Sequence, residues 1–210
     1  EFRADRYLFL GTKHGVVKKT PLSEFGNIRK NGLRAVNLDE DDELIGVKFT
    51  DGENRIMLGT RGGKAITFPE DGVRSMGRVA RGVRGITLAD GDEVVAMDVL
   101  RSDSEVLTVT EGGYGKRTTA SEYRTQTRGG KGLINMKVTE KTGPVVGIRV
   151  VHAGQELMLI TTDGLVIRTS VDEISRISRN TQGVRLMTIA ENDRVASMAT
   201  MNMTVDTISE

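Results

Sequence analysis

Lysine and arginine side chains recur beside pairs of glycines that repeat about every fifty residues along the chain. Cations presented at regular spacing on one surface suit a polyanion, because each of them can neutralise one phosphate. We therefore predict that nucleic acid is contacted by Lys18, Lys19, Arg29, Lys30, Arg34, Lys64, Arg74, Arg78, Arg81, Arg84, Lys116, Arg117, Arg124, Arg128, Lys131, Arg176, Arg179 and Arg185.

The distribution of charge supports this prediction, although the formal net charge of the chain is only +1. Residues 6–38 carry seven Lys or Arg and one acidic residue, whereas residues 39–54 carry seven acidic residues and one Lys. The basic excess falls along the chain, and residues 156–189 carry four residues of each sign. Basic stretches thus alternate with acidic connectors. We expect the first two repeats to contribute most to the binding of a polyanion.

Other kinds of site find little support in the sequence. The chain has no cysteine, and its two histidines, His14 and His152, lie in unrelated contexts. The glycine-rich segments 59–64 and 129–132 lack the spacing and the Ser or Thr of a phosphate-binding loop. The acidic run 39–43 lacks the glycine of a calcium loop. We therefore predict no catalytic residue, no metal site and no cofactor in this chain.

Aromatic residues are scarce, with three tyrosines, five phenylalanines and no tryptophan. Single-stranded nucleic acid is usually held on stacked aromatic platforms. Contact with the backbone of a duplex is therefore the better prediction. Tyr123 lies in a basic stretch, and we expect it to fill space there rather than to stack on a base.

The repeat itself predicts the architecture. The first glycines, Gly15, Gly63, Gly113 and Gly164, are separated by 48, 50 and 51 residues. Short β-branched runs between turn residues indicate strands, four to each unit. In the first unit we expect strands at about 7–12, 15–20, 33–38 and 43–50, and sixteen strands in all.

Four-stranded units at this period are typical of a propeller, with a solenoid as the alternative. We predict an all-β, propeller-like single domain over residues 1–210. Its units are expected at about 6–54, 55–104, 105–155 and 156–203, followed by a tail at 204–210. Whether four units close a ring or form an open arc is left undecided by the sequence. The basic stretches at 21–31, 69–81, 119–131 and 170–182 are expected on the outer rim.

The cellular setting is also suggested by composition. No apolar run approaches the roughly 20 residues that span a bilayer, so we expect no membrane association. The absence of cysteine agrees with a reducing, cytoplasmic location. Because the chain begins at Glu1 without an initiator methionine, we expect it to be a piece of a longer protein.

Three segments, 108–118, 41–47 and 179–184, closely resemble the C-terminal domain of the bacterial DNA gyrase A subunit family. The resemblance implies a β-pinwheel, which is a propeller-like disc whose blades exchange a strand and whose basic rim bends and wraps double-stranded DNA. It implies partners in the rest of the gyrase A subunit and in gyrase B, and a location with the bacterial nucleoid. Catalysis, ATP and magnesium would belong to the rest of the topoisomerase.

The same family usually has six blades, and the four units here match the last four. Its signature box, Gln-Arg-Arg-Gly-Gly-Lys-Gly, belongs to the first blade. Residues 126–132 resemble a degenerate copy of that box, with Thr127 in place of an arginine. The resemblance thus carries DNA contact to Arg128 and Lys131. A topoisomerase IV relative and a protein-interaction propeller with a basic rim are the alternatives.

Overall fold

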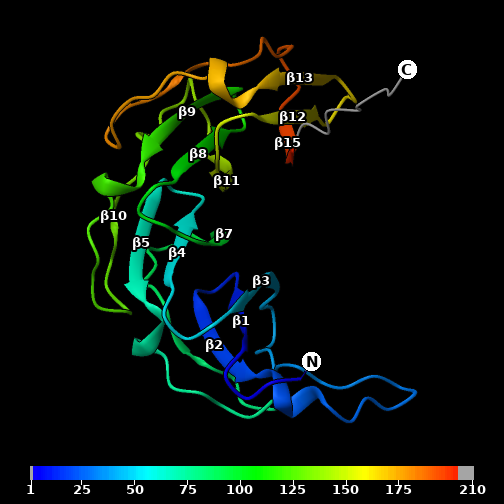
Figure 1. The fold of residues 1–210 in the computed structure, drawn as a ribbon. Helices are drawn as coiled ribbons and strands as arrows, with labels where there is room; N and C mark the ends of the chain where they lie inside the picture. Colours follow the sequence, from blue (N-terminus) through cyan, green and yellow to red (C-terminus); the bar gives the residue numbers. More distant parts are fainter. Residues whose placement is uncertain (1, 203–210) are drawn as a thin grey trace, which may run out of the picture.

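The computed structural model describes residues 2–202, and in that range the chain forms fifteen β-strands and four short 3-10 turns (Figure 1). The strands are β1 (Tyr7–Thr12), β2 (Val16–Pro21), β3 (Leu44–Thr50), β4 (Arg55–Thr60), β5 (Lys64–Pro69), β6 (Val83–Arg84), β7 (Val94–Val99), β8 (Glu105–Thr110), β9 (Tyr114–Thr119), β10 (Leu133–Ile134), β11 (Val145–Val151), β12 (Gln155–Thr161), β13 (Val166–Ser170), β14 (Val184–Arg185) and β15 (Val195–Asn202). The turns are η1 (Leu22–Phe25), η2 (Glu70–Gly72), η3 (Ala120–Glu122) and η4 (Val171–Glu173). No helix in this range has the length and apolar composition needed to cross a membrane.

The strands form four antiparallel sheets, one for each repeat, which confirms the predicted all-β, propeller-like class. The strand orders are β3-β1-β2-β6, β10-β5-β4-β7, β11-β8-β9-β14 and β13-β12-β15. The middle of each sheet is a hairpin closed at the first glycine of the repeat. Gly63 closes the second hairpin with a φ of +86°, a value that residues with a Cβ rarely adopt.

Each complete sheet borrows one short strand from the next unit along the chain. β6 belongs by sequence to the second unit, yet it pairs with β2, with Val17 opposite Val83. β10 pairs in the same way with β5, and β14 pairs with β9. The strand exchange that the family resemblance implied is therefore present. In the described residues, no strand extends the fourth sheet beyond β13.

The expected strand at 33–38 is wrong, because the structure has no strand there. Its counterparts β6, β10 and β14 are extended only because the hairpin of a preceding unit supplies their partner. Within residues 2–202 no sheet precedes the first unit. The segment is held instead by a side chain, since Lys18 Nζ donates 2.7 Å to the carbonyl of Ala35.

The four sheets follow one another along an open arc rather than a closed ring (Figure 1). Strands β3, β7, β11 and β15 lie on the inside of the arc and border one central hollow. The other edge of each sheet lies on the outside, where β6, β10 and β14 add to it. The segments 69–81, 119–131 and 170–182 therefore run along the outer edge of the arc. The loop after η1, which contains residues 26–31 of the expected rim stretch 21–31, extends away from that edge at the end of the arc, so this part of the expectation is wrong (Figure 1).

The apolar core lies between neighbouring sheets, in three clusters. Representative members are Phe9 and Phe68 in the first cluster, Met57 and Val106 in the second, and Leu107 and Leu159 in the third. The rings of Phe9 and Phe68 have centroids 6.5 Å apart. Burial of one such side chain stabilises the fold by about 1.5–3 kcal/mol. The curvature of the arc is thus fixed by packing between sheets.

Candidate nucleic-acid interface

The outer edge of the arc carries three equivalent stretches, which together we call the rim. They are named after the units to which they belong, so that the second rim stretch is 69–81, the third is 119–131 and the fourth is 170–182. Each stretch crosses onto the outer strand of the preceding unit and is tied to it through its backbone. The amide of Met76 donates 2.8 Å to the carbonyl of Lys19, and the amide of Ile177 donates 2.9 Å to that of Arg117. The rim is therefore placed by a strand of the neighbouring unit, so its position follows the exchange of strands.

Most of the predicted cations are exposed, and they lie on the rim, on strands next to it, or on the first-unit segment between η1 and β3. The exposed ones are Arg29, Lys30, Arg34, Lys64, Arg74, Arg81, Arg84, Arg124, Lys131, Arg176 and Arg185. Seven of these eleven belong to the first two units. Lys137 is also exposed and follows the third rim stretch. It was not among the predicted contacts, because it is a single cation that follows the second glycine of its unit. The outer edge thus presents cations from the second, third and fourth units, and the exposed cations of the first unit lie on the segment between η1 and β3.

Three further predicted arginines are half-buried and occupy equivalent places in three rim stretches. Each donates from Nη1 to a backbone carbonyl of the preceding unit. The pairs are Arg78 with Arg34 at 3.4 Å, Arg128 with Arg84 at 2.5 Å, and Arg179 with Ile134 at 2.6 Å. Because a guanidinium has five N–H donors, each of these arginines links two units and retains donors for an anion.

Lys18 and Lys116 are not surface cations, in contrast to our expectation. Their side chains are 1% and 0% exposed, respectively. Lys18 Nζ donates to the carbonyls of Ala35 and Arg78, and Lys116 Nζ donates to those of Ser178 and Arg179. Burial lowers the pKa of each lysine to about 8. We therefore leave both of them out of the proposed DNA-contacting set.

Lys19 and Arg117 are also buried, at 6% and 8% exposure. Lys19 Nζ donates 3.2 Å to the carbonyl of Glu70 and lies 5.0 Å from the centroid of the Tyr7 ring. Arg117 bonds at 2.8 Å to a carboxylate oxygen of Glu105 and donates to two backbone carbonyls. Their donors are occupied within the protein, so neither of them is available to a phosphate.

A signal for these buried cations was present in the sequence. Lys18 and Lys116 are equivalent to Ile66 and Ile167 in the other two units. Ile66 is fully buried and Ile167 is partly buried. A position that is apolar in two of four repeats indicates an inward-facing strand position in all of them. The count of basic residues alone gave no such information.

Several exposed cations are paired with acidic or hydroxyl side chains of the protein. Arg81 bonds to Asp39 at 2.5 Å, and both side chains are largely exposed. Arg176 forms an ion pair with Glu105. Arg185 donates 3.0 Å to the hydroxyl of Tyr114, and this hydrogen bond lowers the pKa of the tyrosine. Exposed ion pairs contribute little stability, so a phosphate can replace Asp39 at Arg81.

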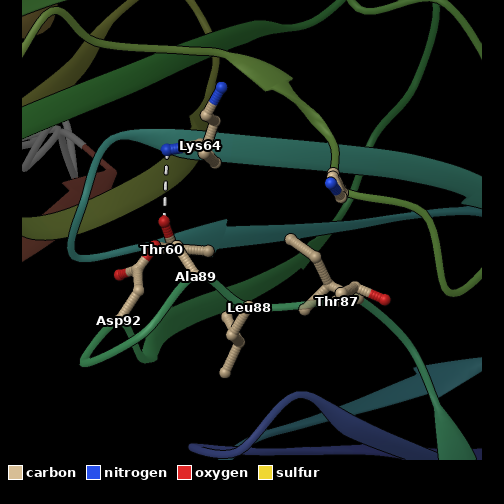
Figure 2. Close-up of a pocket in the computed structure, with 8 residues that line it drawn as sticks. Thr60, Lys64, Thr87, Leu88, Ala89 and Asp92 are labelled. Carbon is tan, nitrogen blue, oxygen red and sulfur yellow. Dashed lines mark hydrogen bonds between the residues drawn. The ribbon is translucent and has the colours of Figure 1, made fainter.

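The second and third units meet at a small hollow of about 230 Å³ (Figure 2). It is lined by Lys64 from one unit and Lys131 from the next, together with Thr60, Thr87 and Asp92. Figure 2 shows the side chain of Lys64 extending away from Thr87 and Leu88. The volume is below the range of typical small-molecule sites. The two lysines are thus better placed to meet an extended anion than an enclosed ligand.

Tyr123 also has a structural place, as predicted. It is 1% exposed, and its hydroxyl donates 2.5 Å to the side-chain oxygen of Asn135, itself fully buried. Burial raises the pKa of this phenol above its usual value. Tyr123 therefore packs beneath the third rim stretch and offers no stacking surface.

Four repeated sheets that exchange strands along an arc define a β-propeller of the pinwheel class. A sequence-family model described as the DNA gyrase C-terminal domain, beta-propeller, matches residues 6–51, 54–101, 104–152 and 155–200. The chain belongs to this family of DNA gyrase C-terminal domains.

Individual relatives agree with the family assignment. The chain is 47% identical over 206 residues to the DNA gyrase A subunit of Salmonella typhimurium, and 45% identical over 208 residues to that of Staphylococcus aureus strain MRSA252. Each match covers 98% of this chain and 24% of the relative, so the chain spans about a quarter of their length.

Solved structures are also similar. The C-terminal domain of DNA topoisomerase IV matches with a TM-score of 0.91 at 28% identity, over 96% of this chain and 64% of that one. The DNA gyrase A C-terminal domain matches with a TM-score of 0.83 at 26% identity, over 94% and 66%. The topoisomerase IV alternative thus shares the fold, while the family model and the curated relatives above are of gyrase.

Proposed function

We propose that this chain binds, bends and wraps double-stranded DNA without catalysing a reaction itself. The observation that carries the proposal is the row of exposed cations along the outer edge of a curved domain of the gyrase family. Duplex DNA presents phosphates at regular intervals, and their neutralisation releases condensed counterions. An array of cations from four successive units suits such a ligand better than it suits a small molecule.

The curvature of the arc requires a bound duplex to bend, and bending costs free energy. Smooth bending of a site of 20–30 base pairs by tens of degrees costs on the order of 1–6 kcal/mol. Phosphate contacts distributed over four units can offset this cost, because each adds a favourable electrostatic contribution. The sheets are held by three apolar clusters, so the protein keeps its curvature and the duplex adapts to it.

In the complete enzyme we propose that this chain supports ATP-dependent negative supercoiling by gyrase, a type IIA topoisomerase. Its partners there are the remainder of the gyrase A subunit and the gyrase B subunit. ATP and magnesium serve those other parts, and this chain uses no cofactor of its own. The proposed location is the bacterial cytoplasm, with the nucleoid. Residues 126–132 contribute Arg128 and Lys131 to DNA contact as a degenerate copy of the family box.

A salt titration with a linear duplex tests the binding proposal. If about 6–10 phosphates are engaged, affinity falls by about three to five decades between about 50 and 200 mM salt. Binding that does not depend on salt overturns the proposal. Preferential binding to an acidic protein, with no affinity for DNA, favours the protein-interaction alternative.

Wrapping requires a second readout. A nicked circle is ligated in the presence of the protein, and its linking number is compared with that of a circle ligated alone. We expect a shift in linking number that grows with protein concentration. If the protein binds DNA without changing the linking number, the chain is a DNA-binding domain and its wrapping role is overturned.

A further inference from the structure

The two buried lysines lie beneath the rim, where each contacts an arginine-bearing stretch of the next unit. Lys116 Nζ bonds to the carbonyls of Ser178 and Arg179 and, at 3.1 Å, to the hydroxyl of Thr181. Lys18 Nζ bonds to the carbonyls of Ala35 and Arg78. Neither ammonium has a carboxylate within ion-pair distance among residues 2–202. Each ammonium is therefore surrounded mainly by backbone oxygen.

The bonded carbonyls belong to the half-buried arginines that link the units. Lys116 fixes the peptide of Arg179, whose guanidinium donates to Ile134 in the preceding unit. Lys18 fixes the peptide of Arg78, whose guanidinium donates to Arg34. In both places a buried lysine fixes the backbone position of a rim arginine. The backbone nitrogen of Arg179 is held as well, since it donates 3.0 Å to Glu122.

The third rim stretch is held differently, because Ile66 occupies the position of the buried lysines. There the hydroxyl of Thr67 donates 2.9 Å to the carbonyl of Arg124. The amide of Gly129 donates 2.8 Å to the carbonyl of Gly85. This stretch is therefore tied through threonine and glycine contacts. The stretches of the second and fourth units also have backbone contacts, and the fourth has a bond of 2.8 Å from the hydroxyl of Thr118 to the carbonyl of Ile177. In these two stretches a buried ammonium adds to the other contacts.

Two simpler roles for the lysines do not fit the geometry. Direct contact with phosphate requires exposure, and the side chains have almost none. Simple filling of space is served better by an apolar side chain, since a buried charge costs free energy unless it is paired or well hydrogen-bonded. Isoleucine occupies this position in the second and fourth units. The ammonium groups of the first and third units lie where two backbone carbonyls converge.

We propose that Lys18 and Lys116 are positioning residues that order the rim stretches at 74–81 and 175–182 before DNA arrives. Ordering in the free protein removes a conformational cost from binding, so affinity rises without any new contact with DNA. The inference rests on the proposed function for its consequence in DNA binding. The ordering itself is a property of the free protein.

The test compares Lys116→Met and Lys18→Met with Lys131→Met, which removes an exposed rim lysine. Amide hydrogen exchange of the free proteins is measured first. In Lys116→Met we expect exchange at Ile177 and Thr181 to accelerate at least about tenfold, the size of change produced by losing about 1.4 kcal/mol of local stability. Lys18→Met accelerates exchange at Met76, and Lys131→Met changes neither region.

Duplex binding is then titrated against salt. Lys116→Met weakens affinity by about tenfold with an unchanged salt slope, because the phosphate contacts are still made in the complex. Lys131→Met lowers the slope by about 0.9 because one contact is lost. Unchanged exchange in both buried variants, or a slope lowered by about 0.9 in them, overturns the proposal. If the wild-type protein does not bind duplex, the proposed function is overturned. The hydrogen-exchange result then still decides whether the lysines order the rim in the free protein.

A chemical rescue separates the ammonium from its packing volume. Because the chain has no cysteine, Lys116→Cys is alkylated in denaturant with 2-bromoethylamine, which restores an ammonium of nearly the same reach, and is refolded. A second sample is alkylated with 1-bromopropane. We expect protection at Thr181 to return only with the aminoethyl group. Equal protection in both samples assigns the lysine to packing and overturns the proposal.

Discussion

The guanidinium of Arg128 donates a hydrogen bond of 2.5 Å from Nη1 to the backbone carbonyl of Arg84. One rim cation therefore holds the backbone of another, which belongs to the preceding unit. Nε of the same arginine donates 3.2 Å to the carbonyl of Gly72. Arg128 is thus a proposed phosphate contact and also a link between units.

These two roles make the substitution Arg128→Ala differ from that of an ordinary surface arginine. We expect it to lower the free energy of unfolding by about 1 kcal/mol through the lost hydrogen bonds, and to lower the salt slope of DNA binding by about 0.9. Urea unfolding and fluorescence anisotropy measure the two effects. Arg124→Ala is the control, since its exposed side chain makes no hydrogen bond within residues 2–202. A stability loss of the same size in both variants contradicts the linking role.

The uneven charge along the arc predicts an uneven contribution to binding. We expect a larger loss of affinity from the double variant Arg78→Ala/Arg81→Ala than from its counterpart in the fourth unit. The counterpart is Arg176→Ala/Arg179→Ala, and each double variant removes one arginine that forms an ion pair, Arg81 with Asp39 and Arg176 with Glu105. The fourth unit has no net charge over residues 156–189, so fewer phosphates are drawn to it. Equal losses in a duplex titration rule out this asymmetry.

The architecture was largely predictable because glycine spacing reports hairpin geometry directly. Gly15, Gly63, Gly113 and Gly164 all have positive φ values and close the four hairpins. The pattern predicted a third strand in each unit, but it did not predict that the two-residue strands β6, β10 and β14 pair with the hairpin of a different unit. Their partners lie in another unit, and periodicity within a unit carries no information about that pairing. The family resemblance supplied it.

The candidate site was predicted less well than the fold. Charge counts do not distinguish exposed from buried lysines when a strand is covered on both faces, and residues 17–20 of β2 are all buried. The usual alternation between a core face and a solvent face is therefore lost at Lys18 and Lys19. Comparison of equivalent positions, such as Lys116 with Ile66, carries the missing information.

The buried lysines also predict how stability depends on pH. The pKa of each is about 8 in the folded chain, against an ordinary value of 10.5. Between these values the unfolded chain binds more protons than the folded chain, so the free energy of unfolding rises with pH. The rise is on the order of 3 kcal/mol per lysine over that window. Below pH 8 the full cost of the buried charge is present.

Urea unfolding of the wild type and of Lys18→Met/Lys116→Met, measured from pH 7 to about pH 10, isolates this effect. Other lysines and the tyrosines titrate in both proteins, so they cancel in the difference. We expect the free energy of unfolding of the wild type to rise relative to that of the double variant as pH rises through the window. A difference that stays constant with pH contradicts the lowered pKa values. The charged groups that act on Lys116 are Glu122 and Arg179, and Arg78 acts on Lys18.

Glu70 is a buried acidic residue, and its role is structural. The side chain is 0% exposed and accepts hydrogen bonds from Thr50, from the amide of Gly52 and from both nitrogens of Asn54. Glu70→Gln places an amide NH2 among these donors, so at least one of them loses its acceptor. We expect a loss of about 1–3 kcal/mol in the free energy of unfolding. Glu53→Gln, at an exposed position nearby, is expected to stay within about 0.5 kcal/mol, and a Glu70→Gln value as small as that refutes the assignment.

The strand exchange itself can be measured by comparing two hairpin glycines that have the same backbone conformation. Gly63 and Gly164 both have a φ of +86°. A Cβ on Gly63 would lie 2.3 Å from the carbonyl oxygen of Met136, which follows the exchanged strand β10. A Cβ on Gly164 would meet nothing within 4 Å in the described structure. The backbone strain is therefore shared, and only Gly63 adds a clash with the neighbouring unit.

We expect Gly164→Ala to cost about 1–2 kcal/mol from the left-handed conformation alone. Gly63→Ala is expected to cost a further 1–3 kcal/mol or so, because a backbone carbonyl must shift to admit the methyl group. Urea unfolding gives both values, and hydrogen exchange at Asn135 and Met136, whose amides donate to the carbonyl of Gly63, locates the added cost at the exchanged strand. Equal costs for the two variants, or unchanged exchange at Met136, contradict the close approach of the units. A larger cost at Gly63 shows that the hairpin turn of the second unit lies in close contact with the segment that follows the exchanged strand β10.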